Sequence, residues 1–414
     1  MEMKSLLCFS ALISSVVSHA ALAYEDAKVM PQNIRRLTYR FVLSDISEKT
    51  DGSATAFPLS RPLSKALTFK DIVKGEKDPV RNALTSGFIG AEGFQMTDAA
   101  GHFVADVQTR VQVSAPIFAY GLTSAMTLAV ALPVYRMQTS ADVSFQASDN
   151  GQQFINRLAS DYNNQTASAN EAATKLNDAV ERLNTKLTDN GYRRLESWQG
   201  SGLGDAQLVL KHKSLEKGAV SLAAQAVLTM PTGRLDDPDN LLDKGFGDGQ
   251  WDLALGATSE ESMDALFEGL SLTQFIRVTE QFSGRRTIRL VTEAETIEVE
   301  KASVEFDLGA RLETGAAVLF SSQQSGWGGA VGYNFSRKGF DRFQAPAETR
   351  AILEKDSLEM MHQAEAEVVF SGVPAFRRGS IPIPFELKLA YKHQLSSRNM
   401  PVAHMLQIDT GVFF

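Results

Sequence analysis

The feature that most constrains the fold of this chain is a strict alternation of side-chain character. From Phe103 to Ile117 every second residue is apolar apart from Thr109, and the residues between them are mostly polar, among them Asp106 and Arg110. Successive side chains of a β-strand point to opposite faces, so this segment predicts a strand with one apolar and one polar face. Its length of about 15 residues exceeds the ~5–6 residues that are usual for soluble sheets.

The same alternation recurs in four further segments, at 128–134, 220–230, 364–370 and 385–391. The apolar faces are rich in Ala, Val and Leu, and most of the opposite faces carry ionisable or amide side chains. Lipid accepts the first kind of surface and a water-filled lumen accepts the second. A secreted β-sandwich also has alternating strands, but the strand length favours an all-β fold, a transmembrane antiparallel β-barrel.

The N-terminus predicts export. Lys4 precedes an apolar stretch over 6–17, and Ala21-Leu22-Ala23 provides the small-residue cleavage site of a secretory signal peptide over 1–23. The apolar stretch is too short to cross a bilayer of about 30 Å. Cleavage would remove Cys8, the only cysteine in the sequence, and leave residues 24–414 as the barrel.

The C-terminus fits the same class of protein. A terminal aromatic residue preceded by alternating apolar residues resembles the assembly signal of bacterial outer-membrane proteins, which the barrel assembly machinery receives. The members of this series are Leu406, Ile408, Thr410, Val412 and Phe414, of which Thr410 is the weakest. We therefore expect the protein in the bacterial outer membrane, in contact with its lipid.

One uncharged segment, from Ile117 to Tyr135, has a competing interpretation. Hydropathy alone would assign it to a transmembrane helix. The turn-like residues 120–124 divide it into two alternating segments, and Pro133 weakens a helix further. We favour a β-hairpin.

A pass along the chain gives about twelve strands, an even number that places both termini on the periplasmic side of a closed barrel. Their connections alternate between short and long, as short periplasmic turns and long outer loops would. The strands lie near 35–43, 103–119, 126–136, 206–213, 219–230, 249–258, 268–280, 306–321, 327–337, 356–370, 382–395 and 402–414.

Two outer loops, near 44–102 and 137–205, are long enough to contain helices. The first has a helix-like stretch over 69–88, and the second spaces Leu176, Val180, Leu183 and Leu187 by three and four residues. Two interpretations stay open. The helices pack over the barrel mouth, or they form a lid or plug that controls entry.

Several short motifs occur in a fixed order along residues 100–400. They are Ala119-Tyr120-Gly121-Leu122-Thr123 leading into Ala131-Leu132-Pro133-Val134, Gly202-Leu203-Gly204-Asp205, Pro231-Thr232-Gly233, Gly247-Asp248-Gly249-Gln250-Trp251-Asp252-Leu253, and Gly332-Tyr333-Asn334-Phe335. This ordered set resembles the bacterial outer-membrane transporter family linked to phenol meta-pathway degradation, a relative of the long-chain fatty-acid transporters. The resemblance implies a passive channel for small hydrophobic or aromatic molecules. The two helical insertions depart from the family pattern.

The alternation also nominates residues that line the lumen. Rings of charge set the ion preference of pores, although such residues also pair across a filled lumen. The lumen candidates are Asp106, Arg110, Lys211, Glu365, Glu367, Lys388 and Lys392. Aromatic residues expected at the membrane interfaces are Tyr120, Trp251 and Phe414.

Other functional classes have less support. The net charge of −8 argues against nucleic-acid binding. His393 beside Ser396 and Ser397 is the one arrangement that suits a rim hydrolase, but a polar rim residue is strongly favoured because no motif or third partner surrounds it. Acidic residues cluster at Asp236, Asp237, Asp239 and Asp243, where a solvated loop is favoured over a Ca²⁺ site.

We expect no catalytic residue, no metal and no cofactor. The predicted function is a channel for a small-molecule solute. A structural or surface-interaction barrel with a closed lumen is the alternative, and an outer-membrane hydrolase is the second.

Overall fold

The computed structural model describes residues 26–75, 79–161, 178–290 and 300–414. The predicted signal peptide over 1–23, with Cys8, lies outside these residues, as does Leu176. No helix in the described ranges is long and apolar enough to cross a membrane.

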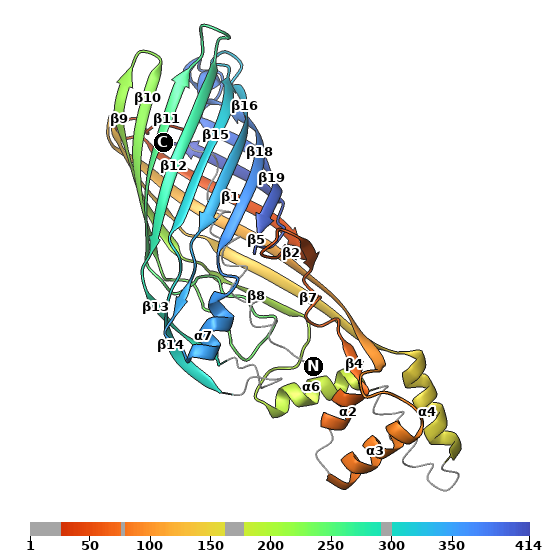
Figure 1. Ribbon diagram of the computed structural model, residues 1–414. Coiled ribbons are helices and arrows are strands. Elements are labelled where there is room, and N and C mark those ends of the chain that lie inside the picture. Colours follow the sequence, from red (N-terminus) through yellow and green to blue (C-terminus); the bar gives the residue numbers. More distant parts are fainter. Residues whose placement is uncertain (1–25, 76–78, 162–177, 291–299) are drawn as a thin grey trace.

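Twelve strands form the closed wall of an antiparallel barrel, as predicted (Figure 1). The sheet closes on itself because β1 pairs with β20 on one side and with β5 on the other. In spatial order the wall consists of β1 (Arg35–Ile46), β5 (Ala99–Thr123), β6 (Met126–Ala131), β9 (Ala206–Lys217), β10 (Val220–Met230), β11 (Asp252–Ser262), β12 (Leu270–Gln281), β15 (Arg311–Ser321), β16 (Trp327–Lys338), β18 (Glu359–Ser371), β19 (Phe385–Arg398) and β20 (Met405–Phe413).

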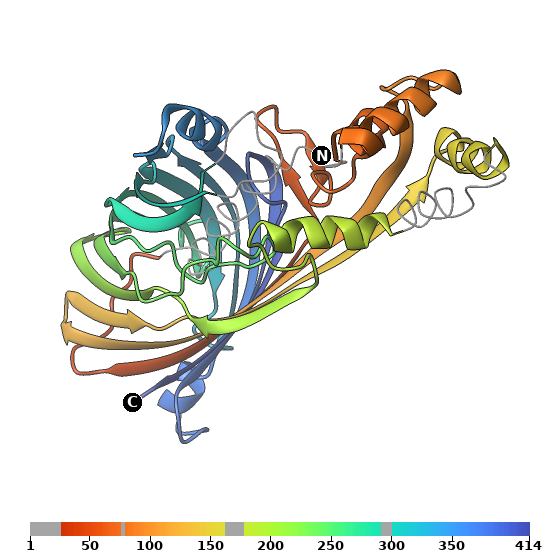
Figure 2. The same ribbon diagram turned by 90° about the horizontal axis from the view of Figure 1, so that it is seen from below.

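Two of these strands bend and leave the wall. β6 continues past Leu132-Pro133 into β7 (Val134–Ala147), and β8 (Trp198–Leu203) reaches β9 through Gly204-Asp205. β7 pairs with the first half of β5 and with β8. Because β5 extends beyond the barrel, these strands form an arm that projects past the barrel perimeter (Figures 1 and 2).

The connections differ sharply between the two ends of the barrel. The short ones, at 124–125, 218–219, 263–269, 322–326 and 372–384, share one end with Arg35 and Phe414; we call this the turn end. The last of them contains α8 (Val373–Arg377). The opposite end, the loop end, receives the long connections, in agreement with the predicted alternation.

The long connections contain the remaining elements. The first holds β2 (Glu48–Thr50), β3 (Ala56–Pro58), β4 (Ala66–Thr68), α2 (Phe69–Gly75) and α3 (Pro79–Ala91), and the second holds α4 (Asp149–Asp161) and α6 (Ala179–Asp189). Later ones hold β13 (Gly284–Arg289), β14 (Lys301–Asp307), β17 (Arg342–Phe343) and α7 (Ala347–Glu354).

The helices of the first two long connections pack in two different places. Phe69 and Phe154 form an aromatic core with Phe94 at the tip of the arm, with the Phe69 ring 5.1 Å from that of Phe154. α6 instead joins the main buried cluster, where Leu183 and Leu187 lie with apolar residues of β1, β5 and β7. The predicted helical signal at 180–187 therefore belongs to a segment that packs at the loop end of the barrel.

Candidate functional site

The lumen has one charged wall, formed by β1, β12, β15, β16 and β18 to β20. Alternate residues of these strands point inward and form ion pairs with neighbouring strands. The pairs are Arg36–Glu386 at 2.6 Å, Arg40–Asp409 at 2.9 Å, Lys388–Glu367 at 2.6 Å, Lys392–Glu365 at 3.9 Å, Arg277–Glu313 at 3.4 Å and Lys338–Glu359 at 3.2 Å. Four of the predicted lumen residues, Glu365, Glu367, Lys388 and Lys392, lie in this wall.

The opposite wall, from β5 through β6, β9 and β10 to β11, is lined mainly by small or apolar side chains. Its inward residues include Ile117, Ala131, Val209, Val227 and Ala254. The two sides of the lumen therefore differ in charge. A network of paired charges faces a less charged surface, on which apolar residues are interspersed with polar ones such as Gln207, Gln225 and Thr229.

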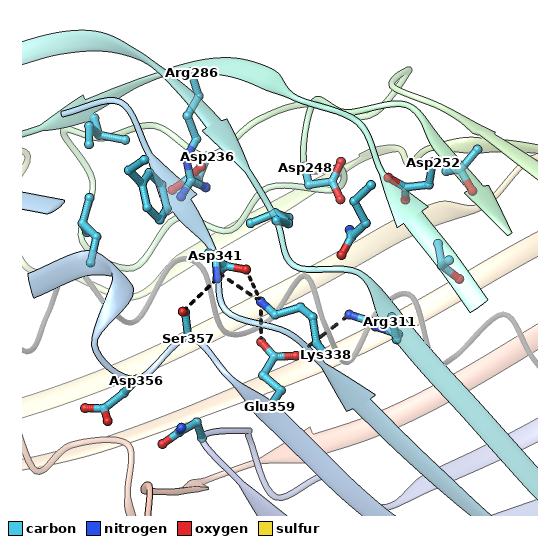
Figure 3. Close-up of a pocket in the computed structure, with 18 of the residues that line it drawn as sticks. Asp236, Asp248, Asp252, Arg286, Arg311, Lys338, Asp341, Asp356, Ser357 and Glu359 are labelled. Atoms are coloured by element: carbon cyan, nitrogen blue, oxygen red, sulfur yellow. Dashed lines mark hydrogen bonds and ion pairs between the residues drawn. The ribbon is translucent and has the colours of Figure 1, made fainter. Parts of the chain in front are cut away.

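A cavity of about 470 Å³ extends between these walls into the loop end. Its charged side is centred on Lys338, whose Nζ lies 2.9 Å from Asp341 and 3.2 Å from Glu359 (Figure 3). Arg311 reaches the same Glu359 carboxylate at 3.9 Å. Residues of α7, β17 and the 282–310 connection complete the lining at the loop end.

Sequence reasoning missed Arg277, Arg311, Glu313, Lys338 and Glu359. Each lies on the inward face of a predicted strand, and Arg277, Arg311 and Glu313 alternate with outward apolar residues such as Val278 and Leu312, which are 50% and 37% exposed. The alternation that identifies Glu365 and Lys392 as lumen residues also extends to these residues, toward the strand ends.

Asp106 and Arg110 correct the predicted lumen set, because both side chains face outward. Arg110 pairs with Asp45 at 2.7 Å on the outer surface, where both side chains are more than half exposed. The odd-numbered face of β5 points inward, and Val107 and Val111 are buried under the loops. Residues 99–108 of β5 lie in the arm, and Arg110 lies at the loop-end edge of the wall opposite Asp45. At this level the outer face of β5 meets water and its inner face meets apolar loops.

Lys211, the remaining lumen candidate, binds the segment that precedes β1. Its Nζ donates to the Asp26 carbonyl oxygen at 2.6 Å. The same segment donates from Ala27 N to Glu260 at 3.3 Å and from Met30 N to Thr127 Oγ1 at 2.7 Å. These anchors belong to β9, β11 and β6, so residues 26–30 cross the lumen at its turn end.

Gly121 allows this crossing. Asn33 N donates to the Gly121 carbonyl at 2.8 Å, and a Cβ on Gly121 would collide with the carbonyl oxygen of Pro31. A side chain at this position would therefore displace the segment. The predicted interfacial residue Tyr120 adds a hydrogen bond to Asn33 at 3.0 Å.

The acidic cluster in the 231–251 connection is neutralised by cations. Asp243 accepts from Arg234 at 2.6 Å, Asp237 pairs with Arg193 at 2.8 Å, and Asp239 binds both Arg289 and Lys301. Among the described residues, no group of three or more His, Cys, Asp or Glu is arranged to hold a metal ion.

Arg289 joins three of the long connections at the loop end. Its side chain is fully buried, lies over the Tyr192 ring at 3.6 Å, and donates to the carbonyl oxygens of Pro238 and Gly191. The connections that contain α6, Asp239 and β13 therefore form a single cap at the loop end.

Hydrogen bonds to the Asp205 carboxylate stabilise the bend between β8 and β9. Asp205 accepts from Gly233 N at 2.8 Å and from Asp248 N at 3.3 Å, and Gly247 lies too close to this carboxylate to carry a Cβ. Burial raises the pKa of Asp205 to about 6, although its backbone donors favour the ionised form. The motifs Gly204-Asp205 and Gly247-Asp248 thus meet in space.

The structure separates His393 and Ser397 of the hydrolase hypothesis. His393 stacks on His404 with ring centroids 4.5 Å apart on the outer face. The Ser397 hydroxyl is buried and bonds Gln394 and Thr50 instead. His393 and Ser397 do not face each other.

Exposed aromatic residues border both ends of the apolar belt. Trp251 lies at the loop end and is 47% exposed, and Phe414 at the turn end is 58% exposed. Leu406, Ile408 and Val412 of the predicted assembly signal point outward from β20.

Comparison with solved structures shows the same fold in an outer membrane channel from Pseudomonas putida F1. The likeness has a TM-score of 0.53 at 12% identity and covers 95% of this chain and 100% of that one. A FadL homologue from Pseudomonas aeruginosa gives a TM-score of 0.32 at 8% identity, covering 93% of this chain and 90% of that chain. No protein-family model and no curated protein matches the sequence.

Proposed function

We propose that the protein is an outer-membrane channel for the passive passage of small hydrophobic or aromatic molecules. The observation that carries this proposal is the cavity, which continues from the long connections into the lumen along a weakly charged wall with apolar residues such as Val209, Val227 and Ala254. A purely structural barrel has no need of such a continuous lining.

Three further features support the proposal. The fold is that of an outer membrane channel from another bacterium. The outward faces carry an apolar belt with aromatic borders. The motif order that resembles phenol meta-pathway transporters favours aromatic solutes.

A barrel with a closed lumen is the second candidate, because residues 26–30 cross the turn end and Arg289 fastens a cap at the other. In that case the arm, with its own aromatic core, would provide the functional surface.

Solute entry into liposomes that contain the purified protein tests the channel. We expect entry of small apolar solutes above the rate of protein-free liposomes, with β-rich circular dichroism and heat-shifted gel mobility as controls for folding. If neither apolar nor polar solutes enter, even after deletion of 150–195, the closed barrel is favoured.

A further inference from the structure

Four neighbouring strands of the charged wall carry one row of outward residues near the loop end. These strands, β15, β16, β18 and β19, lie side by side (Figure 1). Their register aligns Leu312 with Arg337, Arg337 with Met360, and Met360 with Arg398. All four side chains point away from the lumen, because the residues on either side of each one are at most 8% exposed. Apolar residues and arginines therefore alternate along this row, which we call the arginine row.

The arginine row is the first row past the lipid-facing belt. On β16 the outward side chains before Arg337 are those of Trp327, Val331, Tyr333 and Phe335. From Trp327 to Arg337 the strand advances about 34 Å, which is about 24 Å of membrane depth at a tilt near 45°. The apolar band of outer-membrane barrels is about 25 Å tall. The two arginines therefore lie at the level of the lipid headgroups.

The residues just below the arginine row mark the same level independently. Tyr333 Oη and His362 Nδ1 form a hydrogen bond of 2.5 Å, and the Phe335 ring lies 5.0 Å from the His362 ring. Phe335 and His362 also face each other across the strands, one row before Arg337 and Met360. Rings that carry a polar atom are typical of the boundary between acyl chains and headgroups.

The arginines of this row differ from those inside the barrel in having no acidic partner. Inward arginines of the charged wall pair with carboxylates, as Arg40 does with Asp409 at 2.9 Å. In the described ranges, no Asp or Glu forms an ion pair with Arg337 or Arg398, and both side chains are exposed. They are two strands apart, so their Cα atoms lie about 10 Å from each other. Two unneutralised guanidinium groups at this spacing suit a lipid that carries two anionic groups.

We propose that the arginine row binds the phosphate groups of lipid A, the glycolipid of the outer leaflet. The longer connections of outer-membrane barrels lie outside the cell, so the row faces that leaflet. Guanidinium groups bind phosphate oxygens through parallel hydrogen bonds. Leu312 and Met360 provide apolar contact for the acyl chains between the two phosphate contacts. This inference concerns the outer surface of the barrel and is independent of the solute proposed for the lumen.

Two lipids that differ in the number of phosphate groups test the site. Lipid A with two phosphates is the probe, and phosphatidylglycerol, with one, is the comparison. Native mass spectrometry of the full-length protein in detergent counts the lipid molecules that stay bound. We expect lipid A to bind about threefold more tightly than phosphatidylglycerol, which is the effect of one additional exposed ion pair.

Two double variants remove the same charge from opposite ends of the barrel. Arg337→Gln with Arg398→Gln should weaken lipid A binding about tenfold, because two exposed ion pairs are lost. Arg377→Gln with Arg378→Gln, in the exposed turn that contains α8, is the matched control and should leave lipid A binding unchanged. Arg337→Lys with Arg398→Lys keeps both charges and should retain part of the affinity. Heat-shifted gel mobility confirms that each variant folds.

Equal affinity of the wild-type protein for the two lipids overturns this inference. So does an equal loss of lipid A binding in the two glutamine double variants, because net charge alone would then explain the attraction. Unchanged lipid A affinity after loss of Arg337 and Arg398 has the same consequence. None of these measurements involves solute entry, so their outcome and that of the channel test are separate.

Discussion

At the scale of single residues, the lumen shows which charges the fold tolerates inside a barrel. Glu365 and Lys392 are each 3% exposed or less, yet each has an oppositely charged partner within 4 Å. Burying an ion is costly unless a partner of opposite charge compensates it. Removal of one partner should therefore cost more than removal of both.

Lys388→Met tests this rule on one of the two closest inner pairs. Loss of the ammonium group leaves Glu367 buried without its 2.6 Å partner, so we expect a loss of about 3 kcal/mol in the free energy of unfolding. Urea unfolding in lipid vesicles measures it. Addition of Glu367→Gln should restore most of the loss, and failure of this double variant to recover would argue against charge as the cause. Lys213→Met, in a pair with the more exposed Glu216, should cost less than about 1 kcal/mol.

Asp205 gives stability a pH dependence. Its folded-state pKa of about 6 lies above the ordinary value, so the unfolded chain releases this proton first as the pH rises. The contribution to stability is fully present below about pH 4 and is lost as pH rises through about 6. Asp205→Asn should flatten this part of the profile. Urea midpoints measured across that interval check it, and identical slopes in the two proteins would contradict it.

At the scale of elements, the segment that precedes β1 determines how wide the turn end is. It has no regular secondary structure and is anchored to three strands by a few hydrogen bonds and ion pairs. Such a segment is easily released when its anchors are removed.

Lys211→Met combined with Glu260→Met removes two of these anchors. We expect single-channel conductance in planar bilayers to rise about twofold or more, because the pore cross-section limits conduction. Lys217→Met, at the exposed end of β9 beside the turn, is the matched control and should leave the conductance unchanged. Unaltered conductance in the double variant would place the narrowest point elsewhere, most simply in the cap.

At the scale of the whole molecule, the two ends of the barrel are unlike. Short turns and both strand termini share one end, and the arm, the cap and the long connections share the other. Barrels in outer membranes place their longer connections outside the cell.

Cysteine labelling tests this orientation, because the sequence has no cysteine other than Cys8. We expect Ser53→Cys, exposed in the first long connection, to react with an impermeant maleimide on intact cells. Ser214→Cys, exposed near a turn, should react only after the outer membrane is opened. The opposite pattern would invert the orientation.

The sequence by itself determined the strands, their number and the side of each that meets lipid, since alternation is a local property of the chain. It could not tell that Asp106 lies in the arm and Arg110 at the loop-end edge of the wall, because the same alternation continues where β5 leaves the membrane. There the outer face of β5 meets water and its inner face meets apolar loops. It also could not show that Lys211 binds Asp26 or that Gln281 lies opposite Asp252. Those juxtapositions depend on barrel closure and strand register, which bring together residues far apart in the chain. Only the tertiary structure decided what faces the lumen and which outward residues share one row.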